Sequence, residues 1–273
     1  MQKSTLIPNA KQSPEQESAH LLNRDITLQI ALGAGEILVK NGAEMYRVEE
    51  TIVRICESQG ITTVTPLALP TLILVSDDYG QNAVYTKNIK KRSNNINKIA
   101  LVNDFSRKFV SGKIALTEAM DILETINTHK GYPYWLILIA AGVGCGIFAV
   151  LVGGKLGDLI AAFAASCIAV WVNDTIFARV KTVFTGNFVA SMFVGLISVL
   201  SFKIKLVDNL DNIIVGAALA LVPGVAFTAG IRDFISGDLV SGIARIGEAV
   251  LVAIAIAFGV GSILMIFALL GGL

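Results

Sequence analysis

The chain has 273 residues, of which 54% are hydrophobic and 16% are charged, and its mean hydropathy is +0.68. A soluble domain of this size rarely has such a composition, which instead predicts several membrane spans. The formal net charge of +1 at pH 7 excludes the strong basic field of a nucleic-acid-binding protein.

Residues 1–23 are polar, contain Pro8 and Pro14 and lack an apolar core. We therefore expect a disordered tail here and no secretory signal. Long apolar runs begin only near Pro133. A long N-terminal segment without a signal normally stays in the cytoplasm, so residues 24–130 are expected to form a cytoplasmic domain.

The pattern of this N-terminal segment predicts a small α+β domain. Apolar residues recur at helical spacing on both sides of Asn41-Gly42, which we interpret as a helix stop. Segments rich in β-branched residues or bounded by turn residues predict three strands, at residues 61–65, 71–75 and 83–86. Two more helical stripes follow, at residues 99–109 and 116–126.

This domain carries no recognisable catalytic pattern. Acidic and basic residues cluster on one predicted helix, and ion pairs at i,i+3 and i,i+4 on a solvated face explain them. The basic run 87–92 is interpreted as a solvated loop near anionic headgroups, and a specific ligand site is the alternative. The three cysteines have no CxxC spacing. We predict no catalytic residue, no metal and no cofactor, and a membrane-anchored enzyme or regulatory scaffold is kept as the alternative.

The C-terminal half, residues 133–273, predicts five membrane spans, at residues 134–152, 159–172, 188–202, 213–231 and 249–270. The second and third are short, so they must borrow polar flanking residues or thin the bilayer. Gly142 and Gly146 form a GxxxG pattern that favours close helix packing. The predicted fold class is an α-helical integral membrane protein with five transmembrane helices and an N-terminal cytoplasmic α+β domain. We expect it in the cell inner membrane.

The end of the fourth expected span is the main candidate site. Pro223-Gly224 lies mid-span and should break the helix. Polar and charged residues follow, namely Thr228, Arg232, Asp233, Asp238, Ser241, Arg245 and Glu248. Ionisable groups next to apolar spans mark a functional site by default, and broken helices expose backbone groups to a solute. We expect this segment to lie within the helix bundle, although an ordinary loop with local salt bridges is the simpler alternative.

Two segments resemble the threonine/serine exporter family. The first comprises Asn41, Gly42, Ala43 and Glu44, followed by Tyr46, Arg47, Val48, Glu49, Glu50 and Thr51. The second comprises Pro223-Gly224, Arg232-Asp233, Gly237-Asp238, Ser241-Gly242, Arg245 and Glu248-Ala249. The resemblance runs from about Arg24 to the end, with both motifs in the family's order.

This resemblance implies a subunit of a secondary exporter for a small carboxylate-bearing solute. The full family form has about ten spans, so a chain with five resembles the larger component of a split exporter. Its implied partner is a small membrane protein with the missing spans, and association of several copies is a further hypothesis. The split form implies a dicarboxylate such as succinate, and threonine or serine remains open. Arg232 and Arg245 would bind the carboxylate, while Asp233, Asp238 and Glu248 would balance charge or carry a proton.

Overall fold

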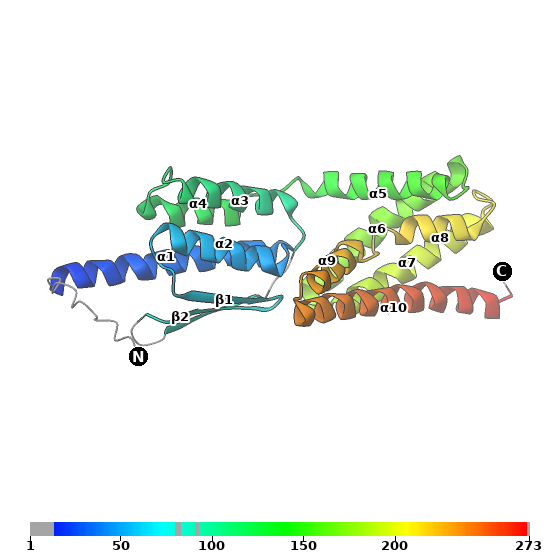
Figure 1. The fold of residues 1–273 in the computed structure, drawn as a ribbon. Coiled ribbons are helices and arrows are strands. Elements are labelled where there is room, and N and C mark those ends of the chain that lie inside the picture. The colour runs from blue at the N-terminus through cyan, green and yellow to red at the C-terminus, as the bar shows by residue number, and fades with distance from the viewer. Residues whose placement is uncertain (1–13, 80–82, 91–92, 272–273) are drawn as a thin grey trace. The chain divides into compact units, whose positions relative to one another are not determined.

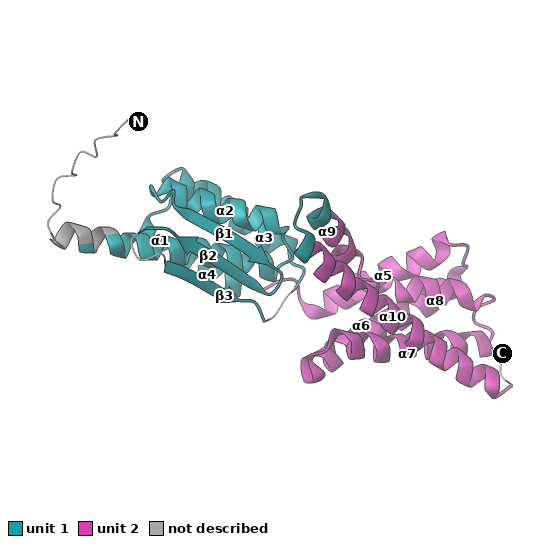
Figure 2. Cartoon of the chain, turned by 60° about the horizontal axis from the view of Figure 1, so that its bottom comes forward, with its two compact units in different colours: residues 1–129, 232–241 teal, residues 130–231, 242–273 magenta. Residues whose placement is uncertain are grey.

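The computed structural model describes residues 14–79, 83–90 and 93–271, and within these ranges it has ten helices and three strands. The described chain divides into two compact units, coloured separately in Figure 2. One unit holds the residues up to His129 together with Arg232–Ser241. The other holds Lys130–Ile231 and Gly242–Leu273.

The first unit has three layers, which Figure 1 shows as a sheet, a middle pair of helices and an outer pair. The middle helices are α1 (Pro14–Lys40) and α2 (Met45–Ser58), and the outer ones are α3 (Ile96–Val110) and α4 (Leu116–Thr128). The antiparallel sheet has the order β1-β2-β3, with strands Val64–Leu69, Leu72–Asp77 and Ala83–Asn88. This arrangement confirms the small α+β pattern expected from the sequence.

The core of this unit lies where the middle helices cover the sheet. Ile73 and Val75 of β2 are fully buried, as is Ile52 of α2. A Cβ placed on Gly35 of α1 would lie 2.9 Å from the Ile52 side chain and 3.4 Å from that of Ile73. The glycine therefore lets α1 approach both neighbours closely, which fixes the position of the helix that carries several residues discussed below.

The boundaries of the first unit differ from expectation at its N-terminal end. Helix α1 begins at Pro14, so the expected tail is wrong for residues 14–23, while residues 1–13 lie outside the described range. The helix stop at Asn41-Gly42 is confirmed, since Gly42 has φ +92° and the amide of Ala43 donates to the carbonyl of Leu38. The first strand begins three residues later than expected, and its Pro66 is accommodated because β1 lies at the edge of the sheet.

The second unit is entirely helical in its described part. Its helices are α5 (Tyr134–Leu151), α6 (Leu156–Val180), α7 (Val183–Lys203), α8 (Leu210–Ala218), and most of α9 (Gly224–Ile235) and α10 (Leu239–Leu269). Among the described residues, four helices are long and apolar enough to cross a membrane: α5, α6, α7 and α10. The chain therefore has the composition and helix lengths of a membrane protein.

Small residues hold the helices of this unit together. A Cβ on Gly142 of α5 would lie 2.6 Å from the sulfur of Cys167 in α6, and one on Gly146 would lie 2.9 Å from the carbonyl of Leu159. A Cβ on Gly216 of α8 would lie 2.6 Å from that of Ala149. The GxxxG prediction of close packing is confirmed, because neither glycine of that pattern leaves room for a side chain.

Two expectations about span length change. Helices α6 and α7 have 25 and 21 residues, so the short second and third spans extend through polar flanks such as Asn173 and Asp174. No thinning of the bilayer is needed at about 1.5 Å per residue. The fourth expected span is not one continuous helix, because α8 ends at Ala218 and α9 starts at Gly224. The break predicted at Pro223-Gly224 is thus confirmed, and a single helix over 213–231 is wrong.

Candidate functional site

The turn between α1 and α2 is built by Asn41 and Gly42. The side-chain amide of Asn41 is buried and donates to the carbonyl of Ile37 at 2.7 Å, while its oxygen accepts from the hydroxyl of Ser93 at 3.0 Å. Gly42 adopts a positive φ, and a Cβ there would lie 2.8 Å from the side-chain oxygen of Asn94. The turn therefore needs both residue types, and it fixes the start of α2.

Glu44, immediately before α2, is the centre of an ionic cluster. Its side chain is only 11% exposed, and it accepts a hydrogen bond from Arg232 at the end of α9. Its second oxygen lies 3.2 Å from Nε of Arg47. Burial raises the pKa of Glu44, but the hydrogen bond from Arg232 and the charges of both arginines outweigh burial and place that pKa below its ordinary value of 4.5. Glu44 is therefore a carboxylate at neutral pH.

Asp233 joins the same cluster from the backbone side. It is completely buried, and its Oδ1 accepts from the amide of Met45, the first residue of α2, at 3.4 Å. The amides at the start of a helix lack partners within the helix, and a carboxylate there is favoured by the helix dipole. Glu44 precedes α2 directly, but its side chain makes no capping hydrogen bond to the helix. Asp233, which is distant in the sequence, caps the helix start instead.

Glu49 and Asp238 form a second acidic group in this unit. Glu49 accepts from the amide of Ala68 in β1 at 2.8 Å. Burial raises the pKa of Glu49, the bond from Ala68 opposes this rise, and the negative charge of Asp238 adds to it, so the pKa lies above its ordinary value. Among the described residues, Oδ2 of Asp238 is buried without a hydrogen-bond partner. Glu49 is therefore a carboxyl group whose surroundings favour its protonated form.

Tyr46 and Arg47, the remaining residues of the first motif, lie on the exposed side of α2. The phenol of Tyr46 accepts from Nε of Arg47 at 3.2 Å, and the Arg47 side chain is 50% exposed. Two charged residues of this motif thus interact with the second motif. Glu44 pairs with Arg232, and Glu49 experiences the negative charge of Asp238. The expected solvated helix face is found at Glu50 and Arg54, which form an exposed i,i+4 pair.

The helix break in the second unit carries other predicted site residues. The carbonyl of Pro223 accepts from the amide of Phe227 at 3.0 Å, so the proline is the residue immediately before α9 and accepts its first hydrogen bond. Thr228 is exposed, and its hydroxyl donates to the carbonyl of Gly224 at 2.9 Å. This hydroxyl is thus engaged within the helix, and Gly224 itself has open space where a side chain would be.

Tight packing of α9 against α10 follows the break. A Cβ on Gly230 would lie 2.8 Å from the side chain of Ile246 and 3.1 Å from the Cβ of Arg245. Arg245 and Ser241 are buried, whereas Glu248 is half-buried on the same helix. The contact at Gly230 therefore positions a buried arginine beside the broken helix.

The predicted site residues thus fall into two groups. Residues 232–241 belong to the same compact unit as the first motif, which brings Arg232, Asp233 and Asp238 to Glu44 and Glu49. Pro223, Gly224, Thr228, Arg245 and Glu248 belong to the other unit. Our expectation that the whole ionic segment lies within the helix bundle is wrong for residues 232–241. The reason is that α2 offers this segment both a carboxylate partner and an uncapped helix start.

Sequence reasoning missed one buried acid. Asp158, near the start of α6, is 2% exposed, and its Oδ2 accepts from the amide of Lys155 at 2.7 Å. Its position three residues after the residue that precedes the helix is a capping pattern that the sequence already displays.

Comparison with known proteins shows the family to which this chain belongs. A family model described as "Putative threonine/serine exporter" matches residues 29–267 and so includes both motifs. The chain belongs to the threonine/serine exporter family. No solved structure matches the chain.

Relatives within the threonine/serine exporter family carry two kinds of name. The chain is 25% identical to the "Probable succinate transporter subunit YjjP" of Klebsiella aerogenes, over 82% of this chain and 87% of the relative. It is 23% identical to the protein of that name from Escherichia coli K12, over 89% and 95%. It is 21% identical to the "Probable threonine/serine exporter" of Mycobacterium tuberculosis, over 86% of this chain and 44% of that protein. The sequence-based assignment to this family is therefore confirmed.

Proposed function

We propose that this chain is the larger subunit of a two-component secondary exporter for a small carboxylate-bearing solute. In this proposal it crosses the cell inner membrane five times and keeps its N-terminal domain in the cytoplasm. Family membership supports export, and the four long apolar helices support a multi-pass membrane protein. The fifth crossing is assigned to α8, the break and the part of α9 before Arg232, which together run from Leu210 to Ile231 and have about the length of one span.

The relatives support a partner subunit. Two of them are named as transporter subunits, and the chain covers 87% and 95% of their lengths. It covers only 44% of the mycobacterial protein that is named as an exporter without reference to subunits. A small membrane protein with a second set of spans would supply the part that the longer relative carries in one chain.

The observation that carries the proposal is the meeting of the two family motifs. Glu44 of the first motif pairs with Arg232 of the second, and Asp233 binds the start of α2. Arg232 keeps a side chain that is 59% exposed, so its guanidinium can still reach a solute carboxylate. A solute that competes with Glu44 for Arg232 would loosen the ion pair at the end of α9, which gives binding a direct effect on this helix.

Each residue of the second motif then has a proposed role. Arg232 and Arg245 attract the carboxylate, and Pro223-Gly224 gives α9 its separate start. Thr228 and Ser241 are proposed as further polar residues that contact the solute. Asp233, Asp238 and Glu248 balance charge or carry a coupling proton, and Glu49, whose pKa is raised, is a further candidate carrier of that proton. Succinate and threonine or serine are the two solute classes to test.

An efflux assay tests this proposal. Vesicles containing the chain and its small partner are loaded with radiolabelled succinate or L-threonine, and loss of label is followed over time. We expect Arg232→Ala, Arg245→Ala and Asp238→Asn each to slow efflux by about tenfold, equivalent to about 1.4 kcal/mol. Arg54→Ala is the matched control, because this exposed arginine of α2 pairs with Glu50 and with no other acidic side chain that the structure describes. Wild-type efflux in all three variants would refute the site, and no efflux of either solute by the wild-type pair would refute the exporter.

A further inference from the structure

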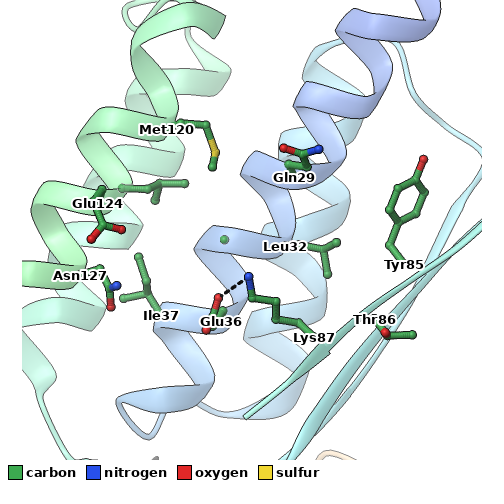
Figure 3. Close-up of a pocket in the computed structure, with 12 residues that line it drawn as sticks. Gln29, Leu32, Glu36, Ile37, Tyr85, Thr86, Lys87, Met120, Glu124 and Asn127 are labelled. Atoms are coloured by element: carbon green, nitrogen blue, oxygen red, sulfur yellow. Dashed lines mark ion pairs between the residues drawn. The ribbon is translucent and has the colours of Figure 1, made fainter. Parts of the chain in front are cut away.

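A pocket in the first compact unit lies outside the candidate transport site. It has a volume of about 390 Å³ and is enclosed by α1, β3 and α4 (Figure 3). This volume falls in the range of about 300–1,000 Å³ that is usual for small-molecule sites. None of the residues that line it belongs to either family motif, so the transport proposal leaves it without a role.

The base of the pocket is apolar. Leu32 and Ile37 of α1 and Leu123 of α4 line it, and all three are buried members of the domain core. Gly33 faces the space between them, and a Cβ there would make only an ordinary contact with Leu123 at 3.4 Å. The base therefore accepts a small apolar group, and a large side chain at position 33 would fill the space.

One wall of the pocket carries the ion pair of Glu36 and Lys87, and Lys40, which does not line the pocket, also pairs with Glu36. Nζ of Lys87 in β3 lies 3.0 Å from one oxygen of Glu36, and Nζ of Lys40 lies 2.5 Å from the other. Burial raises the pKa of Glu36, but the hydrogen bonds and charges of the two lysines outweigh it and lower that pKa overall. Two ammonium groups thus share one carboxylate, and the Lys87 side chain remains 47% exposed to the pocket and solvent.

The opposite wall carries an acid and an amide. Glu124 of α4 lines the pocket across from Lys87, as Figure 3 shows, and has no ion-pair partner among the described residues. Asn127 of α4 lies on the same wall and Gln29 of α1 lines the pocket beside it, and neither side-chain amide makes a hydrogen bond within the described part of the protein. The backbone carbonyl of Asn127, by contrast, already accepts from Lys98. This wall therefore offers a negative charge and a free amide group.

We propose that this pocket binds a zwitterionic amino acid with a small apolar side chain. The ligand carboxylate would pair with Lys87, the ammonium group with Glu124, and the side chain would rest on Leu32 and Leu123. A dicarboxylate fits less well, because its second carboxylate would face Glu124. A simple amine fits less well for the opposite reason, since nothing on it would pair with Lys87. This site is separate from the one proposed for transport.

Binding to the full-length protein in detergent tests the inference. Equilibrium dialysis with radiolabelled L-threonine and L-valine measures the affinity of zwitterions, and succinate and L-threonine methyl ester serve as the dianion and the cation. We expect at least one zwitterion to bind, and Lys87→Met and Glu124→Gln each to raise its Kd by about tenfold. Gly33→Leu should abolish binding by filling the base while leaving the charges in place.

Two matched controls and one transport variant make the outcome specific. Lys113→Met and Glu118→Gln remove exposed charges outside the pocket and should leave Kd unchanged. Arg232→Ala should also leave it unchanged, because Arg232 is not part of the pocket. Hydrogen exchange in α1 and α4 verifies that each variant is folded. The inference is overturned if neither zwitterion binds, if succinate binds as tightly, or if Arg232→Ala abolishes binding while the pocket variants do not. Loss of efflux in the earlier assay has no bearing on these results.

Discussion

At the scale of single residues, the ion pair between Arg24 and Asp77 joins the first helix to the sheet. Two nitrogens of Arg24 donate to the two oxygens of Asp77, at 2.7 and 2.5 Å. The hydroxyl of Thr63 adds a third hydrogen bond at 2.7 Å. Both charged side chains are more than nine-tenths buried. Breaking such a pair leaves a buried charge without its partner, which is far more costly than losing a surface pair.

We therefore expect Asp77→Asn to destabilise the N-terminal unit by about 3 kcal/mol at neutral pH. Burial raises the pKa of Asp77, but the bonds from Arg24 and Thr63 outweigh it and lower the pKa below its ordinary value of 3.8. The carboxylate thus stabilises the fold above about pH 4, and this contribution is lost as the pH falls through the lowered pKa. Hydrogen exchange of the β2 amides, measured against pH, reports the difference between the two proteins.

The exposed pair of Glu50 and Arg54 is the control for this measurement. Its two side chains are 59% and 45% exposed, so Glu50→Gln should change the stability by less than about 0.5 kcal/mol. If Asp77→Asn had as small an effect as Glu50→Gln, or if its effect grew toward low pH, the assigned role of the buried pair would be wrong.

At this scale, the sequence indicated which residues belong to the site, but it did not indicate which residues pair with one another. Glu44 and Arg232 were both singled out, each within its own motif. Their pairing could not be read from the chain, because 188 residues separate them and helical periodicity relates only near neighbours. The ion pairs of Arg24 with Asp77 and of Lys87 with Glu36 were not predicted for the same reason, since the two partners of each pair lie on different elements.

At the scale of elements, the contact between α9 and α10 determines what the broken helix can do. The two helices touch at Gly230, where a Cβ would lie within 3.2 Å of three atoms of Arg245 and Ile246. A Cβ placed on Gly247 of α10, by contrast, would have no neighbouring atom within 4 Å. The two glycines therefore allow a comparison in which the substitution is the same and only the contact differs.

We expect Gly230→Val to slow efflux by about tenfold, because the side chain forces α9 away from the buried Arg245. Gly247→Val carries the same cost in helix propensity and should retain most of the wild-type rate. The efflux assay described above, with membrane levels of each variant checked by immunoblotting, measures both. Equal rates for the two variants would show that close packing at Gly230 is not needed for transport.

Sequence patterns predicted the elements where the backbone itself is constrained. Pro223-Gly224 and Asn41-Gly42 both mark helix ends in the structure, since proline and a positive φ act locally. The predicted spans 159–172 and 188–202 are shorter than α6 and α7, because the predicted bounds exclude polar residues such as Asn173 and Asn187. Asn187 lies inside α7, where its side-chain amide donates to the carbonyl of Val183 at 2.8 Å. A polar residue satisfied within its own helix is compatible with a longer span.

At the scale of the whole molecule, the division into units cuts across the division expected from hydropathy. Composition predicted a soluble part and a membrane part, with the boundary near Pro133. The structure assigns residues 232–241 to the N-terminal unit, although apolar helices flank them on both sides. Hydropathy describes the solvent a segment prefers and carries no information about which distant segment it contacts. The family resemblance nevertheless flagged both contacting segments.

The central claim is that the two family motifs act as one site through Glu44 and Arg232. Exchanging the charges tests it directly, with efflux measured for Glu44→Arg, Arg232→Glu and the double variant. The account predicts that each single variant loses about tenfold in rate, because like charges then meet, and that the double variant recovers most of it. Wild-type rates in both single variants, or a double variant no better than the worse single one, would contradict it.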